Sequence, residues 1–233
     1  MTGSATALWS ALIGQDAVVA ELQHAVADAE RITRGEHGPA MTHAWLVTGP
    51  PGSGRSTAAV TFATALVCPE GGCGVCQVCR TAAHGGHPDV EIVRPDGLSY
   101  GVDESRDLIQ RAARSPVASH WHTVVLEDAD RMTDEAVNAL LKSLEEPPPH
   151  TVWILCAPSV EDVLPTIVSC TRHVPLRTPT AAEVAALLVE RYGVDRAIAA
   201  FAARASQGHI GRARALATDE HARVRRHEIM RVP

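Results

Sequence analysis

The sequence has few aromatic residues, a single lysine and no excess of positive charge. Phenylalanine, tryptophan and tyrosine make up 3% of its 233 residues, and the formal net charge is −6. Proteins that bind single-stranded nucleic acid use aromatic side chains for stacking, and non-specific binding to phosphate backbones needs a basic surface. The composition therefore disfavours a protein that binds nucleic acid by itself, and any contact with DNA should be local or shared with partners.

Long hydrophobic runs are also absent. No stretch of about 18 apolar residues occurs, so the sequence predicts no membrane-spanning helix. Residues 1–12 lack the basic and then apolar order of a secretory signal. Hydrophobic residues make up 45% and charged residues 21%, which is typical of globular domains. We expect a cytoplasmic protein with no membrane partner.

Apolar runs that alternate with helical periodicity predict an α/β fold. Short apolar runs predict buried strands at residues 44–48, 90–93, 123–126 and 152–156. Helical spacing predicts helices at residues 8–32, with Asp16 as N-cap, and at residues 56–67, 102–114 and 133–144. Because the strands are apolar on both faces, we expect a parallel sheet covered by helices on both sides.

The character of the chain changes at Thr178. No strong strand follows, and helical spacing predicts three helices at residues 181–191, 195–205 and 210–217. The sequence therefore predicts an α/β domain at residues 1–177 and a small three-helix domain at residues 178–220. Residues 221–233 are charged and are expected to begin a linker, so we expect the chain to be part of a longer protein.

Residues 49–56, GPPGSGRS, follow a predicted strand and open a predicted helix. In that context a glycine-rich loop of this pattern binds phosphate, because its backbone N–H groups and the helix N-terminus point at the oxygens and the serine hydroxyl ligates Mg²⁺. The sequence predicts binding of ATP or ADP with Mg²⁺. The residues expected to hold the phosphates are Gly49, Gly52, Ser53, Gly54, Arg55, Ser56 and Thr57. The alternative is a Gly/Pro turn that caps an ordinary helix.

Two departures from the usual pattern predict weak hydrolysis. Arg55 stands where lysine is usual, and its planar guanidinium is wider than the ammonium group that reaches between phosphates. Glu127 and Asp128 follow a predicted strand, where active nucleotidases place an Asp near Mg²⁺ and a Glu that orients water, but here the order is reversed. The alternative for this acidic pair is a loop that caps the next helix.

Four of the six cysteines lie close together in the sequence. They are Cys68, Cys73, Cys76 and Cys79. Their spacing, with Gly71, Gly72 and Gly74 to permit tight turns, is typical of a tetrahedral structural Zn²⁺ site. His84 or His87 could replace one cysteine, and an iron–sulfur cluster or unligated thiols are further alternatives.

Taken in order, these features resemble the bacterial AAA+ clamp-loader family, and within it the delta-prime subunits of DNA polymerase III. The most specific segment is NALLKSLEEPP at residues 138–148. Other matching segments are IGQ at 13–15, HAWL at 43–46, HPDV at 87–90, ADRM at 129–132 and LPTI at 164–167. The resemblance implies an AAA+ domain, a helical lid and a collar domain that this sequence lacks. It also implies a ring with gamma/tau and delta subunits that places the sliding clamp on primed DNA.

The resemblance also implies roles for two arginines. The family arginine that reaches the ATP of a neighbouring subunit aligns with Cys170, and Arg172 is a candidate substitute. Arg212 matches a lid arginine that could meet a phosphate. Either could instead be solvated or ion-paired. Since delta-prime subunits commonly do not hydrolyse ATP, we expect a positioning subunit. The alternatives are an active ATPase of the gamma/tau type and an unrelated zinc-containing DNA-binding protein.

Overall fold

Within the described residues, 6–95 and 97–219, the computed structural model contains a five-stranded parallel sheet. Its strands are β1 (Ala44–Thr48), β2 (Val90–Val93), β3 (His122–Leu126), β4 (Thr151–Ala157) and β5 (Arg172–Pro175), in the spatial order β2-β3-β4-β1-β5. The first four match the predicted strands to within one residue. The sequence did not predict β5, because this edge strand buries only Val174 and so has no apolar pattern.

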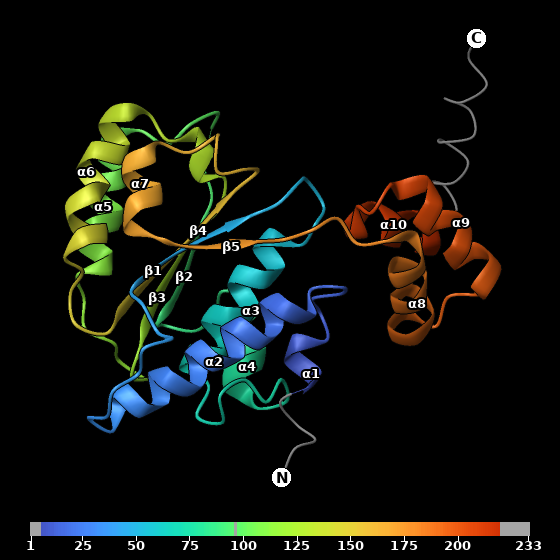
Figure 1. Cartoon of the computed structure of the whole chain (residues 1–233), viewed down its shortest axis with the longest axis horizontal. Helices are drawn as coiled ribbons and strands as arrows, with labels where there is room; N and C mark the ends of the chain where they lie inside the picture. The colour runs from blue at the N-terminus through green and yellow to red at the C-terminus, as the bar shows by residue number, and fades with distance from the viewer. Residues whose placement is uncertain (1–5, 96, 220–233) are drawn as a thin grey trace.

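Helices cover both faces of the sheet, as the sequence predicted. Successive side chains of a strand point to opposite faces, so Trp45 packs in one buried cluster with α2 and α3, and Leu46 packs in another with α5 and α6. The helices are α1 (Thr6–Trp9), α2 (Asp16–Thr33), α3 (Arg55–Val67), α4 (Gln77–Ala82), α5 (Val102–Ala112), the 3-10 helix η1 (Ala129–Arg131), α6 (Asp134–Glu145) and α7 (Pro165–Cys170). Figure 1 shows α5, α6 and α7 on one side of the sheet and α2, α3 and α4 on the other. None of the described helices is long and apolar enough to cross a membrane.

Helix α6 carries the predicted apolar stripe and ends before three consecutive prolines. Thr133 begins it, because its hydroxyl accepts a hydrogen bond from the N–H of Ala136 at 3.2 Å. Leu140 and Leu144 are fully buried against the sheet, whereas Leu141 is half-buried. The predicted packing is therefore confirmed for Leu140 and Leu144, and Leu141 lies at the margin of the stripe.

In the described residues after β5, three helices form a unit that we call the lid. They are α8 (Ala181–Tyr192), α9 (Arg196–Ser206) and α10 (Ile210–Thr218). Thr180 and Glu183 form a capping box at the start of α8, and Asp195 and His209 cap α9 and α10. The buried side chains of the lid form their own cluster, beside the sheet in Figure 1. A parallel α/β fold followed by a small all-α unit is therefore confirmed, while the predicted linker at 221–233 lies outside the described residues.

The helix predicted at residues 8–32 is in fact two helices. A turn that contains Gly14, with φ of 65°, separates α1 from α2, and Asp16 is the first residue of α2 rather than its N-cap. The N-cap is Gln15, whose side chain turns away from the helix. Its Nε2 donates to the carbonyl of Arg177 at 2.7 Å, and its Oε1 accepts from the N–H of Arg177 at 3.2 Å. These two bonds tie the start of α2 to the segment before the lid.

Candidate phosphate-binding loop and metal centre

The predicted phosphate loop connects β1 to α3 at the carboxyl end of the sheet. Gly52 and Gly54 have φ of 86° and 98°, a region that favours glycine. A Cβ at Gly52 would lie 2.3 Å from Cγ of His209, and the carbonyl of Gly52 accepts a hydrogen bond from the N–H of Ile210 at 3.3 Å. Glycine is therefore required at position 52, because the start of α10 packs directly on the loop.

The loop presents hydrogen-bond donors that the helix itself does not use. The first N–H groups of an α-helix have no intrahelical partner, and in α3 they belong to Arg55, Ser56 and Thr57. The hydroxyl of Ser53 is buried and has no hydrogen-bond partner. A buried polar group without a partner costs about 1–3 kcal/mol, so an anion that accepts from this hydroxyl would be stabilised. These donors fit phosphate oxygens.

A cavity of about 390 Å³ lies between the loop and the lid. Its lining includes Gly52, Gly54, Arg55, Ser56, Thr57, Leu187, Arg191, Tyr192, His209, Ile210 and Arg214. Cavities of about 300–1,000 Å³ hold small-molecule ligands and cofactors. The guanidinium of Arg214 lies 5.5 Å from the ring centroid of Tyr192, while Arg212, which the sequence singled out, is exposed and does not line this cavity.

Arg55 folds back onto the loop that carries it. Its Nη1 donates to the carbonyl of Gly49 at 2.6 Å, and its Nη2 lies 3.9 Å from Oδ1 of Asp128. The side chain is only 14% exposed. The guanidinium therefore has acceptors within the protein itself, on both the loop and the acidic segment after β3.

Glu127, the first residue of the predicted acidic pair, is held by Arg94. Nε and Nη2 of Arg94 donate to the two carboxylate oxygens at 3.0 Å each, and the hydroxyl of Tyr100 donates to the backbone carbonyl of Glu127 at 2.5 Å. Burial raises the pKa of Tyr100, which keeps this donor protonated. Asp128, with φ of 52°, approaches Arg55 instead. Sequence reasoning missed Arg94 because 33 residues separate it from its partner.

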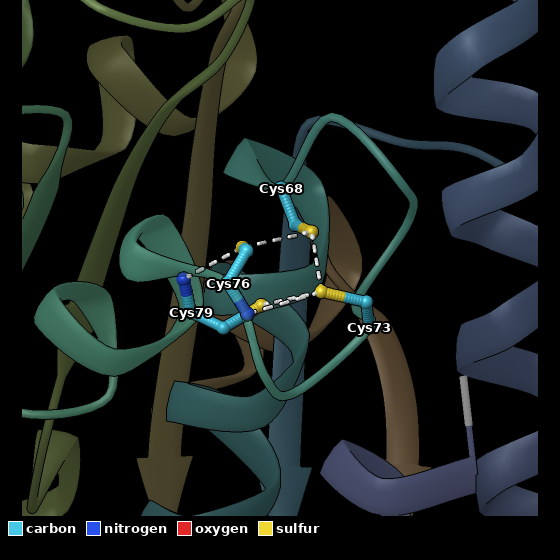
Figure 2. Close-up of side chains that lie close together, drawn as sticks. All are labelled: Cys68, Cys73, Cys76 and Cys79. Atoms are coloured by element: carbon cyan, nitrogen blue, oxygen red, sulfur yellow. Dashed lines mark hydrogen bonds between the residues drawn. The ribbon is translucent and has the colours of Figure 1, made fainter. Parts of the chain in front are cut away.

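The four predicted zinc ligands lie together at the end of α3 and the start of α4 (Figure 2). Their sulfur atoms all lie within 4.8 Å of one another, and the Sγ of Cys68 lies 3.9 Å from those of Cys73 and Cys76. Four thiolates at about 2.3 Å from a tetrahedral Zn²⁺ are about 3.8 Å apart, whereas disulfide sulfurs are about 2.05 Å apart. The cluster therefore fits one tetrahedral ion. It is too tight for an iron–sulfur cluster, which spreads its ligands over several irons.

Backbone groups and burial act on these thiols in opposite directions. The N–H groups of Gly74 and Cys79 donate to the sulfurs of Cys79 and Cys76 at 3.3 Å each. The N–H groups of Val75 and Cys76 lower the pKa of Cys73 to about 7, whereas burial raises the pKa of Cys79. Buried thiolates need a nearby cation, which a divalent metal would supply.

In the loop between α3 and α4 that holds the cysteines, glycine is needed both for the backbone turns and for close packing. Gly72 and Gly74 have φ of 100° and 76°, as the predicted turns require. A Cβ at Gly72 would lie 3.0 Å from the side chain of Leu8, and one at Gly74 would lie 2.8 Å from its backbone nitrogen. Helix α1 therefore packs directly on the loop. In the part of the chain that the structure describes, neither His84 nor His87 belongs to the cysteine group.

The other predicted arginine, Arg172, lies at the start of β5. Its Nε donates to Oε1 of Glu21 at 2.7 Å, its Nη1 donates to the carbonyl of Ala40 at 3.0 Å, and its guanidinium lies 5.2 Å from the ring centroid of Trp45. The sequence left open whether this arginine is ion-paired, and in this structure it is. Cys170, where the family arginine was expected, is half-buried beside Glu145.

Comparison with known proteins gives consistent matches. The family model described as "DNA polymerase III, delta subunit" matches residues 24–180. The gamma/tau subunit of DNA polymerase III from Mycobacterium tuberculosis is 36% identical over 212 residues, covering 87% of this chain and 35% of that protein. The delta′ subunit from Bacillus subtilis is 35% identical over 140 residues, covering 59% of this chain and 43% of that protein. The chain thus spans about two fifths or less of these relatives.

Solved structures share the fold. A DNA polymerase III gamma subunit-related protein from Thermotoga maritima has 25% identity and a TM-score of 0.53, covering 72% of this chain and 50% of that one. A variant of RuvB from Thermotoga maritima has 16% identity and a TM-score of 0.61, covering 93% and 65%. These likenesses confirm the expected AAA+ fold. An unrelated zinc-containing DNA-binding protein, one of the alternatives from the sequence, does not agree with the matches.

Proposed function

Because this chain belongs to the family described as DNA polymerase III, delta subunit, we propose that it is a subunit of the sliding-clamp loader of the replicative polymerase. Relatives named as gamma/tau and delta′ subunits support this role. In the loader the subunit positions its neighbours and hydrolyses ATP slowly or not at all. Its partners are the gamma/tau and delta subunits, the sliding clamp, and primed DNA through the assembled complex. The family's part in DNA replication supports a cytoplasmic location.

The contacts of Arg55 are the main support for the proposal that this subunit does not hydrolyse ATP. In a phosphoryl-transfer site the loop cation neutralises charge on the transferred phosphate. Here the cation is bonded to the carbonyl of Gly49 and lies near Asp128. The other carboxylate of the pair, Glu127, has both oxygens occupied by Arg94. Neither Arg55 nor Glu127 is therefore free for its part in hydrolysis. The backbone N–H groups at the start of α3 are still available to bind phosphate. ATP or ADP with Mg²⁺ therefore binds weakly, without turnover.

Zinc has a structural part in the proposal. Cys68, Cys73, Cys76 and Cys79 hold one Zn²⁺, which closes the loop between α3 and α4 with no open coordination position. The division into an AAA+ domain at residues 1–177 and a lid domain at residues 178–220 accords with the separate buried clusters. Arg172 and Arg212 keep their proposed roles only if assembly releases the first from Glu21 and brings the second to a phosphate.

Assembly tests the proposed role. The full chain is mixed with gamma/tau and delta subunits and separated by size-exclusion chromatography with mass measurement. We expect one stable complex that contains this chain. Matched mixtures that lack the chain should give smaller species, and an unchanged elution position with and without it would contradict the proposal.

An active subunit of the gamma/tau type is a second candidate. The observation that favours it is the match with the mycobacterial gamma/tau protein, which covers 87% of this chain against 59% for the Bacillus delta′ subunit. This candidate requires ATP turnover by the chain itself. Turnover of the isolated chain at about 1 s⁻¹ or more, the low end of common enzyme rates, would favour it if the activity is lost in Ser56→Ala.

A further inference from the structure

A second cavity adjoins the first beside the phosphate loop. Its volume is about 470 Å³, and Ala11, Ser56, Thr57 and Arg191 line both cavities. From there it extends between α1, α3 and α4, the helix that carries Cys79, and these three helices lie side by side in Figure 1. We call it the arm. Cys79 is one of its lining residues, so the arm is walled on one side by the proposed zinc site.

Three arginines from separate parts of the fold line the arm. Arg80 comes from α4, Arg94 follows β2, and Arg191 comes from α8. Among the described residues that line the arm, Glu127 is the one carboxylate, and Arg94 already neutralises it. Arg80 and Arg191 form no ion pair with any carboxylate of the described residues. Because Arg94 is paired with Glu127, Arg80 and Arg191 leave two uncompensated positive charges among the described lining residues, in a chain whose net charge is −6.

We propose that the arm, which shares Ser56 and Thr57 with the phosphate loop, is a second oxyanion site for a small ligand that carries a phosphoanhydride group, such as pyrophosphate. Guanidinium groups bind phosphate oxygens through pairs of parallel N–H···O bonds. The hydroxyls of Ser56 and Thr57 add donors at the mouth that the two cavities share. Among the described residues that line the arm there is no phenylalanine, tyrosine or tryptophan, and His84 is the one ring, so the phosphates rather than a base carry the recognition.

Matched charge-neutralising variants distinguish the arm from the first cavity. Arg80 lines only the arm, Arg214 lines only the first cavity, and Arg196 on α9 lines neither. Each is changed to Gln in the zinc-loaded full chain, and pyrophosphate binding is measured by isothermal titration calorimetry at low ionic strength. We expect Arg80→Gln to weaken binding about fivefold or more, because it removes a charge-assisted contact. Arg214→Gln and Arg196→Gln should bind pyrophosphate within about twofold of the native chain.

A second variant guards against damage to the zinc site, since Arg80 follows the ligand Cys79. Arg191→Gln on the lid should weaken pyrophosphate binding like Arg80→Gln, with zinc content and melting temperature unchanged. The proposal is overturned if Arg80→Gln does not weaken binding more than Arg196→Gln does, or if Arg214→Gln weakens it as much, because Arg80 lines the arm alone whereas Arg191 lines both cavities. It is also overturned if only ATP binds, because the phosphates would then belong to a nucleotide in the first cavity. The chain is titrated alone, so the result does not depend on assembly into a clamp loader.

Discussion

Arg94 holds both carboxylate oxygens of Glu127, at 3.0 Å each, across the ends of two neighbouring parallel strands. The carboxylate is 13% exposed, whereas the arginine is 69% exposed. A carboxylate with both oxygens engaged in this way is not free to hold Mg²⁺, which is the part of the first acidic residue in the usual order. Restoring the usual loop residue with Arg55→Lys should therefore not bring turnover to about 1 s⁻¹.

Removing the Arg94 side chain, which holds Glu127, should increase the rate of ATP hydrolysis. The double variant Arg55→Lys/Arg94→Ala should hydrolyse ATP faster than Arg55→Lys alone in a steady-state phosphate-release assay, because the carboxylate becomes free. Arg106→Ala is the control, since Arg106 pairs with the exposed Asp103 on α5. Equal rates in the double variant and in Arg55→Lys with Arg106→Ala would show that the Arg94 contact does not limit hydrolysis.

The zinc site should contribute to stability. Native protein purified without chelator should contain about one zinc per chain, and Cys73→Ser should lose most of the metal and melt at a lower temperature. Cys170→Ser is the matched control, because Cys170 is half-buried and lies outside the cluster. Metal analysis and thermal unfolding check both. Unchanged metal content and melting temperature in Cys73→Ser would contradict the assignment.

Adjacent leucines of α6 give a test of the packing. Leu140 is fully buried and Leu141 is half-buried at the margin of the same cluster. Leu140→Ala should lower the free energy of unfolding by about 2–5 kcal/mol, and Leu141→Ala by clearly less, because it removes fewer contacts. Denaturant unfolding of the two variants measures the difference. Equal losses, or a larger loss for Leu141→Ala, would show that the orientation of α6 is wrong.

Asp89 predicts a pH dependence of stability. Burial by itself raises the pKa of this carboxyl, but the N–H groups of Val117, Ala118 and Ser119 and the Ser119 hydroxyl outweigh it and hold the pKa below its usual value. Because the folded pKa lies below the unfolded value of about 3.9, the stabilisation is complete above that pH and is lost as the pH falls through the folded pKa.

Substitution of Asp89 should show this loss directly. Asp89→Asn should lower the free energy of unfolding by about 1–3 kcal/mol at neutral pH. The reason is that the NH₂ group of the asparagine would face the N–H groups that donate to the native carboxylate. The difference from the native chain should shrink on acidification below about pH 4. Asp103→Asn, at a side chain that is 91% exposed, should stay within about 0.5 kcal/mol. A pH-independent difference for Asp89→Asn would contradict the charge argument.

Local patterns predicted what depends on nearby residues. The strands at the centre of the sheet have apolar side chains on both faces, and α6 ends before its three prolines, so both could be read from the sequence. The cysteine group could also be predicted, because its four cysteines lie within twelve residues. Edge strand β5 was missed because it buries only Val174, and α4 and α7 were missed because six residues are too few to repeat a helical pattern. Helix α1 was not separated from α2 in the prediction.

Contacts between distant residues could not be predicted in this way. Gln15 bonds to Arg177 across 162 positions, and Arg172 pairs with Glu21 across 151. Arg212 was singled out from a short segment match, whereas the direction of α10 places Arg214 at the cavity. The identity of the residues that surround a site therefore depended on the sheet order and the lid position, which the sequence pattern does not specify.

The central claim is that the phosphate loop of this subunit does not hydrolyse ATP in the clamp loader. It is tested most directly by ATP turnover of the reconstituted loader. Complexes are assembled with the native chain or with Ser56→Ala, which removes the hydroxyl expected to ligate Mg²⁺. The account predicts that both chains assemble and that turnover per complex is the same within error. A loss of turnover in the complex that carries Ser56→Ala would show that this loop hydrolyses ATP, and would contradict the account.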